Sequence, residues 1–364
     1  MRDLSYLSAW GWNERLTDSL SSVSDGSHIG RVVEQVHHTY HVVIDADGAT
    51  VAATVAGSFE YRIAELSDYP AVGDWVVLEP DAPRIMSVMP RGSVVSRAAS
   101  GTRTQEQVIV ANVSVLFLVF GLDGGRNFSE GLLLRSLLTA RNAPARPVVV
   151  LNKCDIANAS HIDAVRAAVS DAAPGTRVHV VSAVSGAGIT GLLGELEPGE
   201  TVALLGKSGV GKSALLNVFS GHGADGGPAR IGAQRQGDLQ GRHTTTYKSL
   251  YRLPSGVIVA DLPGLRELQL WGETDSLDEA FPDIAVLARD CRFSDCRHDG
   301  EPGCRVAEAL GTGELSADRF ERYLEYQREL LYLERRRDQR AQAEEKKRWK
   351  VISKELKRMK RDKP

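Results

Sequence analysis

The sequence has few cysteines and no long hydrophobic run, and each shortage excludes a class of protein. Four cysteines in 364 residues are too few for a secreted fold that depends on disulfides. The longest apolar run, 108–122, is interrupted by Asn112 and Ser114 and is shorter than the roughly 18 residues of a membrane span, so it predicts a buried parallel strand. The N-terminus lacks a basic start followed by an apolar segment, so no export signal is expected. We therefore expect a cytoplasmic protein without a membrane partner.

The charge of the chain is unevenly distributed. The whole sequence carries a formal charge of −3, whereas residues 335–363 hold fourteen Lys/Arg against five Asp/Glu. An acidic body with a basic tail usually contacts a polyanion through the tail. Apolar side chains also recur along the tail at helical spacing, namely Trp349, Ile352, Leu356 and Met359. Two interpretations stay open, a tail that docks on RNA or an anionic membrane surface and a solvated, partly disordered basic helix.

Hydrophobic patterns divide the chain into regions. Its length, with 42% hydrophobic and 25% charged residues, predicts a folded protein of two or three domains. Residues 30–91 read as several short strands separated by turn signals, which predicts a small β-barrel. From residue 113 to 205, strands alternate with helices, one of them at about 129–140, which predicts a parallel sheet with helices on both faces. Ser316 is the expected N-cap of a later helix.

A glycine-rich motif follows the last of these strands. The pattern GxxxxGK[ST] lies between a predicted strand and a predicted helix, the context that a phosphate-binding loop requires. Its residues are Gly206, Lys207, Ser208, Gly209, Val210, Gly211, Lys212 and Ser213. The N–H groups of such a loop surround the β-phosphate, Lys212 is expected to neutralise the β- and γ-phosphates, and Ser213 is expected to bind Mg²⁺. A chance glycine turn is the alternative, and the flanking elements argue against it.

A second motif, DLPG, supplies the other carboxylate that a magnesium–nucleotide site needs. Asp261 would hold Mg²⁺ through water, and the N–H of Gly264 would approach the γ-phosphate. Alone, this motif is as often an Asp-Pro-Gly turn. Between the two motifs lies GRHTTT, one of whose threonines would bind Mg²⁺ when the γ-phosphate is present. The pattern does not decide among Thr244, Thr245 and Thr246, and Thr245 is our assignment.

A third motif, NKCD, is typical of a guanine-selecting loop. The carboxylate of Asp155 can accept hydrogen bonds from N1–H and the 2-amino group of guanine, a pair of donors that adenine does not present. Asn152 is expected to brace the neighbouring loops, and the stem of Lys153 to cover the base. Ser182 and Ala183 follow the next strand, in the usual position of a backbone contact to the guanine oxygen. NKxD alone is often an ordinary turn, so the assignment depends on its combination with the phosphate loop.

Three of the four cysteines cluster with a histidine. The spacing is Cys291-x4-Cys296-x-His298-x5-Cys304. Three thiolates and one imidazole complete a tetrahedral structural zinc site and leave no open position for catalysis. Unrelated buried thiols are the alternative. We predict one structural Zn²⁺, whose loss would unfold this segment more than it slows the reaction at the nucleotide site.

The order of these motifs resembles that of the circularly permuted GTPases. Ordinary GTPases carry the phosphate loop first, whereas here NKCD and Ser182-Ala183 come first. With GRVVEQV, QVIVANV, GKSGVGKS, GRHTTT, DLPG and the cysteine–histidine spacing, residues from about 30 to 335 are similar to the bacterial ribosome-small-subunit-dependent GTPase A family. The resemblance implies an OB-fold barrel, a GTPase domain stimulated by the 30S subunit, a zinc domain and a role late in small-subunit assembly.

On this basis we expect a multidomain α/β protein. Its parts are an N-terminal extension (1–29), an OB-fold β-barrel (30–97), a circularly permuted P-loop GTPase domain (98–274), a helical zinc-binding domain (275–334) and a basic C-terminal tail (335–364). The expected function is hydrolysis of GTP to GDP and phosphate by a monomer, stimulated by the 30S subunit and its 16S rRNA, with release in the GDP state. Two alternatives stay open, an RNA-binding assembly scaffold whose affinity is tuned by nucleotide and a GTPase with a non-ribosomal partner.

The motifs do not supply a residue that orients the attacking water. The position after DLPG, where many GTPases carry glutamine, is Leu265, and an apolar side chain cannot orient water. His243 is the candidate replacement, as the resemblance also suggests, and a solvent-exposed loop histidine is the alternative. Gly209 occupies the position where potassium-activated GTPases usually have asparagine, so no potassium requirement is predicted.

The permuted order also has a mechanical consequence. The segment that senses the γ-phosphate leads directly into the C-terminal module. We therefore hypothesise that the nucleotide state moves that module relative to the barrel. Indistinguishable scattering profiles with GDP and with a GTP analogue would contradict this hypothesis.

Overall fold

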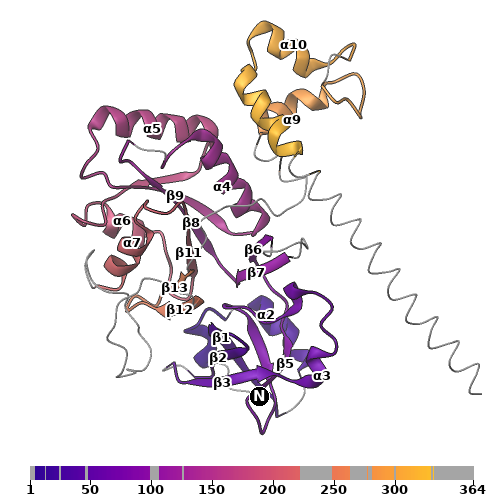
Figure 1. Ribbon diagram of the computed structural model, residues 1–364, viewed down its shortest axis with the longest axis vertical. Helices are drawn as coiled ribbons and strands as arrows, with labels where there is room; N and C mark the ends of the chain where they lie inside the picture. The colour runs from indigo at the N-terminus through magenta and orange to yellow at the C-terminus, as the bar shows by residue number, and fades with distance from the viewer. Residues whose placement is uncertain are drawn as a thin grey trace, which may run out of the picture. The chain divides into compact units, whose positions relative to one another are not determined.

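The chain forms two compact units (Figure 1). A computed structural model describes residues 5–12, 14–23, 26–45, 48–98, 106–124, 127–221, 248–262, 277, 281–298, 301–328 and 331. The first unit comprises residues 1–98 and 105–269, and the second comprises residues 99–104 and 270–364.

Five short strands near the N-terminus close into a barrel. They are β1 (His28–Val36), β2 (Thr39–Val43), β3 (Thr50–Val55), β4 (Trp75–Leu78) and β5 (Arg84–Val88). They follow the order β1-β2-β3-β5-β4, and β4 pairs again with β1. The barrel interior is filled by apolar side chains, among them Val32, Val42, Val76, Leu78 and Ile85. Because β4 pairs back with β1, the strands form a closed ring, which confirms the predicted OB-fold barrel.

The segment before the barrel packs into the core of the first unit. It contains the short helices α1 (Ser5–Ser8) and α2 (Glu14–Asp18) and the 3₁₀ turn η1 (Ser19–Ser22). Leu7, Trp10 and Leu16 are buried in the main hydrophobic cluster of this unit. The ring of Trp12 meets Trp75 of the barrel edge-to-face, with centroids 5.0 Å apart. These contacts make the extension part of the folded unit.

A two-stranded ribbon follows the barrel, and it divides the long apolar run seen in the sequence. The ribbon pairs β6 (Val94–Ala98) with β7 (Glu106–Ala111) in antiparallel fashion. Asn112, in the left-handed region with φ of 55°, then turns the chain into β8 (Val115–Gly121). The interpretation of the run 108–122 as one parallel strand was therefore wrong, since its first part pairs antiparallel and only its second part joins the parallel sheet.

The central sheet is the parallel sheet that the sequence predicted. Its strands are β8, β9 (Arg146–Asn152), β10 (Arg177–Val180), β11 (Thr201–Leu205), β12 (Lys248–Arg252) and β13 (Ile258–Asp261). They follow the order β10-β9-β8-β11-β13-β12, with all neighbours parallel except the antiparallel pair of β12 and β13. The carboxyl ends of the parallel strands therefore meet at one edge, where ligands bind in open α/β sheets.

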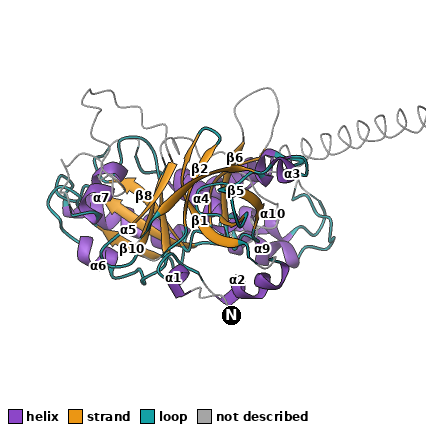
Figure 2. Cartoon of the chain, turned by 90° about the horizontal axis from the view of Figure 1, so that it is seen from below, coloured by secondary structure: helices purple, strands orange, loops and turns teal. Residues whose placement is uncertain are grey.

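Helices cover both faces of this sheet (Figure 2). They are α4 (Glu130–Asn142), α5 (Ala159–Ala172), α6 (Ile189–Leu193) and α7 (Lys212–Phe219). Alternate residues of β8 face opposite sides: Leu116, Leu118 and Phe120 pack with α4 and α5, and Val115, Phe117 and Val119 pack with α6 and α7. Ser129 begins α4 by accepting a hydrogen bond from the N–H of Leu132 at 3.2 Å, as expected of an N-cap.

Strand β12 joins the barrel to the central sheet. Ser249 of β12 pairs with Glu34 of β1 on one side and with Asp261 of β13 on the other. The barrel strands and the central strands thus form one continuous eleven-stranded sheet. Beside this junction, the Nζ atom of Lys248 lies 3.4 Å from the carbonyl oxygen of Val108. Burial, followed by the charge of Arg97, lowers the pKa of Lys248 to about 8.

A buried arginine connects three segments of the first unit. Arg31 donates from Nη1 to the carbonyl of Trp10 at 2.5 Å, from Nε to that of Gly73 at 3.2 Å and from Nη2 to that of Asn112 at 3.2 Å. The three acceptors belong to the N-terminal extension, the barrel and the turn before β8. Burial lowers the pKa of Arg31 to about 10, although the nearby carboxylate of Asp74 opposes this shift.

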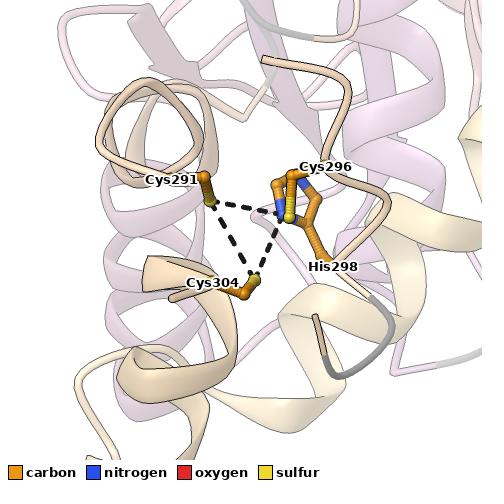
Figure 3. A group of neighbouring side chains, drawn as sticks. All are labelled: Cys291, Cys296, His298 and Cys304. Atoms are coloured by element: carbon orange, nitrogen blue, oxygen red, sulfur yellow. Dashed lines mark hydrogen bonds between the residues drawn. The ribbon is translucent and has the colours of Figure 1, made fainter. Parts of the chain in front are cut away.

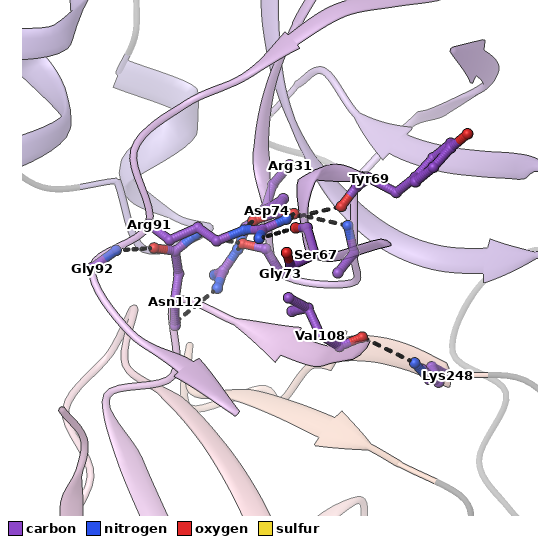
Figure 4. A network of polar contacts seen from close by, with 11 residues as sticks. Arg31, Ser67, Tyr69, Gly73, Asp74, Arg91, Gly92, Val108, Asn112 and Lys248 are labelled. Carbon is purple, nitrogen blue, oxygen red and sulfur yellow. Dashed lines mark hydrogen bonds and ion pairs between the residues drawn. The ribbon is translucent and has the colours of Figure 1, made fainter. Parts of the chain in front are cut away.

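Asp74 forms a two-bond ion pair with Arg91 in the same region (Figure 4). The guanidinium of Arg91 donates from Nε to Oδ1 at 2.8 Å and from Nη2 to Oδ2 at 2.7 Å, and Nη1 donates to the carbonyl of Ser67 at 2.6 Å. Burial raises the pKa of the Asp74 carboxyl in spite of this pairing. A fully buried carboxylate requires such partners to remain charged.

The second unit is helical in its described part. It contains α9 (Pro282–Arg289), α10 (Arg305–Thr312) and a helix over 317–328. The hydroxyl of Ser316 accepts from the N–H of Arg319 at 3.4 Å, which confirms the predicted N-cap. The predicted basic helix of the tail, 335–364, lies outside the described residues. Within the part of the chain that the structure describes, no helix combines the length and the apolar character needed to cross a membrane.

Candidate functional site

The phosphate loop connects β11 to α7. Gly206 lies against β8 so closely that a Cβ atom there would be 2.3 Å from the carbonyl oxygen of Val119, which only glycine avoids. Val210 is fully buried and anchors the loop under α6 and α7. The Nζ atom of Lys212 donates to the carbonyls of Gly206 at 2.7 Å and Lys207 at 2.8 Å. The ammonium group is therefore folded back over the loop, beside the N-terminus of α7.

The outer part of this loop is exposed. Ser208 and Gly209 form its tip, and Ser213 is exposed in the first turn of α7. Backbone N–H groups at the start of a helix have no acceptor within the helix and attract anions. The loop therefore presents N–H groups, the Lys212 ammonium and the Ser213 hydroxyl to the same region.

Asn152, at the end of β9, contacts both of the other segments that the sequence predicted to bind nucleotide. Its side chain is 2% exposed. Its Nδ2 donates to the carbonyl of Val210 at 2.9 Å, and its Oδ1 accepts from the N–H of Ala183 at 3.1 Å. Gly211 adopts φ of 96°, and a Cβ atom there would be 2.3 Å from Asn152 Nδ2. Asn152 thus connects the NKCD loop, the phosphate loop and the segment after β10.

Asp155 is oriented by a buried serine. The hydroxyl of Ser182, which is fully buried, donates to Asp155 Oδ1 at 2.5 Å, and it accepts from the N–H of Ser185 at 3.0 Å. The structure therefore brings together the NKCD loop and the Ser182-Ala183 segment. Because the Ala183 N–H already donates to Asn152, a guanine oxygen bound there has to share or replace that acceptor.

Lys153 is held by a residue that the sequence analysis did not identify. Its backbone is in the left-handed region, with φ of 71°, and its Nζ lies 2.6 Å from Oδ2 of Asp123. Asp123 follows β8, the strand beside β9, and no motif marks it. The only available signal was an acidic residue just beyond a buried strand that ends at the same edge as NKCD.

Asp261 and Ser213 lie at the ends of neighbouring segments. Asp261 ends β13, and Ser213 follows β11, which pairs with β13 in parallel register. Both therefore emerge at the same edge of the sheet. Burial raises the pKa of Asp261, and a bound cation would reverse that effect by stabilising the carboxylate. A hydroxyl and a carboxylate are oxygen ligands of the kind that Mg²⁺ prefers, so the residues fit this ion.

Several predicted site residues lie outside the described residues. They are His243, Thr244, Thr245, Thr246 and Gly264. Leu265, at the position after DLPG, lies outside them as well.

The cysteines and histidine of the second unit form one compact group (Figure 3). One ligand atom from each of Cys291, Cys296, His298 and Cys304 lies within 4.8 Å of all the others. The Sγ atoms of Cys291 and Cys304 are 4.0 Å apart, and Nδ1 of His298 is 3.7 Å and 3.5 Å from them. Zinc–sulfur bonds of about 2.3 Å place the ligands of a tetrahedral site roughly 3.8 Å apart. The spacing therefore fits a zinc ion.

Backbone turns bring the four ligands together. Gly303, with φ of 79°, accepts at its carbonyl from the N–H of Arg292 at 3.1 Å. The carboxylate of Glu301 accepts from the N–H of Arg297 at 2.9 Å, between two of the ligands. Burial lowers the pKa of His298, with Glu301 opposing the shift, which favours the neutral imidazole that binds metals.

Comparison with known proteins shows which family this chain resembles. The profile of the RsgA GTPase family matches residues 88–271. A small ribosomal subunit biogenesis GTPase RsgA of Opitutus terrae is 40% identical over 95% of each chain. A second, from Oceanobacillus iheyensis, is 37% identical over 91% of this chain and 93% of its own.

Two solved structures resemble the fold over most of its length. YjeQ from Thermotoga maritima is 28% identical with a TM-score of 0.61, and it aligns over 84% of this chain and 99% of its own. YloQ, described as a circularly permuted GTPase, is 26% identical with a TM-score of 0.59, and it aligns over 84% of this chain and 95% of its own.

The fold and the site define a class of enzyme, the circularly permuted P-loop GTPases, which hydrolyse GTP. The NKCD loop precedes the glycine-rich loop in the chain, yet both meet at one edge of a parallel sheet through Asn152. The family within that class follows from the matching profile and from two relatives that are at least 37% identical over more than nine-tenths of the chain. The chain belongs to the RsgA GTPase family.

Proposed function

We propose that this chain hydrolyses GTP while bound to the small ribosomal subunit, assists the late maturation of that subunit, and leaves it in the GDP state. The observation that carries the proposal is the naming of its relatives as small ribosomal subunit biogenesis GTPases, together with their alignment over more than nine-tenths of the chain. The partner would be the 30S subunit and its 16S rRNA.

In the proposed site, the guanine base occupies the edge formed by the ends of β8, β9 and β10. Asp155 accepts from the N1–H and 2-amino groups of the base, while Ser182 keeps its carboxylate oriented. Asn152 holds the base loop at a fixed distance from the phosphate loop, and the stem of Lys153 covers the ring. A nucleotide that lacks these donors would cover the carboxylate without replacing the hydrogen bonds from water that it loses, which selects GTP over ATP.

The phosphates would lie in the loop Gly206–Ser213, whose N–H groups and Lys212 ammonium neutralise their charge. Bound Mg²⁺ would supply further neutralisation of the β- and γ-phosphates, held by Ser213 and, through water, by Asp261. We assign Thr245 as a further magnesium ligand and Gly264 as the N–H donor to the γ-phosphate. His243 is our candidate for orienting the attacking water.

We propose that Cys291, Cys296, His298 and Cys304 hold one zinc ion in a structural role. All four positions of a tetrahedral site are filled by protein ligands, so none is open to substrate. The spacing of the ligand atoms supports this assignment. Because its four ligands come from successive turns of the chain, the metal would contribute directly to the folding of this segment.

Several finer features belong to the same proposal. We assign the protein to the cytoplasm, where ribosomal subunits assemble, and treat it as a monomer. The basic residues 335–363 would contact rRNA phosphates. The division into an N-terminal extension, an OB-fold barrel, a GTPase domain, a zinc domain and a tail remains our proposal for the functional parts.

The decisive experiment measures steady-state hydrolysis of GTP, with ATP as control, alone and with purified 30S or 50S subunits. We expect slow turnover alone and strong stimulation by 30S only. Turnover of GTP that neither subunit changes would assign the enzyme to another partner. Binding to 30S without stimulated turnover would instead favour the assembly scaffold.

A further inference from the structure

The loop after β8 carries an ion pair that neither its motifs nor the comparisons assign. Asp123 Oδ2 lies 2.6 Å from Lys153 Nζ. The side-chain amide of Asn127 donates to both oxygens of the same carboxylate, at 2.9 Å and 2.8 Å. The carboxylate of Asp123 thus accepts hydrogen bonds from the amide of Asn127 and from the ammonium group of Lys153.

The backbone fixes both ends of this contact. Lys153 adopts a left-handed conformation that residues other than glycine seldom take, and the N–H of the next residue, Cys154, donates to the carbonyl of Val181 at 3.1 Å. On the opposite side, the N–H of Leu122 donates to the carbonyl of Asn152 at 2.8 Å. The two loops are therefore tied together at the residues next to the ion pair.

The carboxylate is prepared for this role. Hydrogen bonds from Lys153 and then from Asn127 lower the pKa of Asp123, so the group is charged at neutral pH. The two side chains are only 21% and 27% exposed. A free lysine side chain samples many rotamers, and ordering it on ligand binding reduces affinity. Fixing its far end beforehand removes part of that loss.

We propose that Asp123, oriented by Asn127, is a positioning residue for the nucleotide: it anchors the ammonium group of Lys153 so that the lysine stem lies ready over the face of the guanine ring. The inference rests on the proposed nucleotide site. Asp123 acts only through Lys153. It affects the contact of the lysine stem with the face of the guanine ring, and it does not affect the hydrogen bonds of Asp155 with the edge of the base. It therefore affects affinity for the base without changing which base is preferred.

The test measures affinity and dissociation rate of fluorescent GDP for Asp123→Asn in the full chain. We expect affinity to fall about two- to fivefold, the range for a partly exposed ion pair, through faster dissociation. Asp123→Glu, which keeps the charge, should recover part of the loss. Asp163→Asn makes the same chemical change at an exposed position of α5 and should leave affinity at the wild-type value.

A double-mutant cycle separates positioning from simple structural support. In a Lys153→Met background, Asp123→Asn should have no further effect, because the group through which it acts is gone. Asp123→Asn should also reduce the affinity for GDP and the affinity for inosine diphosphate, which lacks the 2-amino group, by the same factor. An equal loss with and without Lys153, or a changed preference between the two bases, would overturn the proposal and indicate a collapsed loop or a direct contact.

Failure of the underlying site gives a different result. If wild-type protein does not bind GDP, or if Asp155→Asn binds it normally, the proposed nucleotide site is wrong. If both behave as expected and Asp123→Asn binds GDP normally, only the positioning role is wrong.

Discussion

Asn152 lies so close to Gly211 that a Cβ atom at residue 211 would be 2.3 Å from the side-chain nitrogen of the asparagine. That nitrogen donates to the carbonyl of the preceding residue, Val210. One buried amide therefore sets the distance between the NKCD loop, which we propose reads the base, and the glycine-rich loop, which we propose holds the phosphates.

Replacing Gly211 tests this distance. In Gly211→Ala the new methyl group displaces Asn152, leaves the Val210 carbonyl without its donor and adds strain at positive φ. Gly209→Ala is the control, since Gly209 also has positive φ but nothing lies within 4 Å of its added Cβ. We expect the free energy of unfolding in urea to fall by about 1–3 kcal/mol more for Gly211→Ala than for the control. Equal losses would show that the clash is absorbed elsewhere.

A change at Asp155 should alter the choice of base. In Asp155→Asn one carboxylate acceptor becomes an amide donor, which faces the 2-amino group of guanine unfavourably but suits the 2-oxo group of xanthine. We expect GTP affinity to fall about a hundredfold, as for loss of hydrogen bonds to a charged group, and affinity for xanthosine triphosphate to rise. Competition binding measures both. An unchanged preference would place guanine recognition on other residues.

Removing zinc should unfold the second unit selectively. A strong chelator should release one zinc per chain and abolish hydrogen-exchange protection over 281–298 and 301–328, while the central sheet stays protected. Cys291→Ser should reproduce this result. Cys154→Ser makes the same substitution outside the cluster, and its protein should retain one zinc per chain. Native protein without stoichiometric zinc would contradict the assignment.

Stability should depend on pH through Lys248. Its pKa is about 8 in the folded protein against 10.5 for an ordinary lysine, so the unfolded chain binds more protons between these values. The free energy of unfolding should therefore be highest above about pH 10 and should decrease as the pH falls towards 8. The total decrease due to Lys248 is up to about 3 kcal/mol. In urea unfolding from pH 7 to 9.5, the free energy of unfolding of Lys248→Met should change less with pH than that of the wild type. Parallel profiles would mean that Lys248 titrates normally.

Breaking the buried ion pair should cost more than breaking an exposed one. Arg91→Met leaves Asp74 fully buried without its main partner, and we expect a loss of about 3–5 kcal/mol. Arg84→Met removes the exposed pair of Arg84 with Glu79, whose arginine is 54% exposed, and should cost less than about 1 kcal/mol. Denaturant midpoints compare the two. Similar losses would show that Asp74 finds another partner or takes up a proton.

The sequence predicted those parts of the protein that depend on local patterns. The continuous apolar run of β8 and the context of the phosphate loop are properties of consecutive residues, so hydrophobicity and turn chemistry reveal them. The cluster around Cys291 was recognisable because its four ligands are close in sequence.

Other features depend on closure of the whole fold. Arg31 finds its acceptors at Trp10, Gly73 and Asn112, and only the folded barrel brings these carbonyls together. Asp123 meets Lys153 because β8 and β9 are neighbours in the sheet, which no spacing in the chain expresses. The change of pairing partner at Asn112 was missed for a similar reason, since the apolar character of the run continues on both sides of that residue.

The pairing of β12 with β1 imposes an order on the making of this protein. Glu34 leaves the ribosome early in synthesis, whereas its partner Ser249 follows more than two hundred residues later. Until then that end of β1 presents an unpaired strand edge, a template for wrong association between nascent chains. A fragment that stops before residue 248 keeps this edge permanently, so the barrel is fully protected only in a chain that has been translated beyond its phosphate loop and through β12.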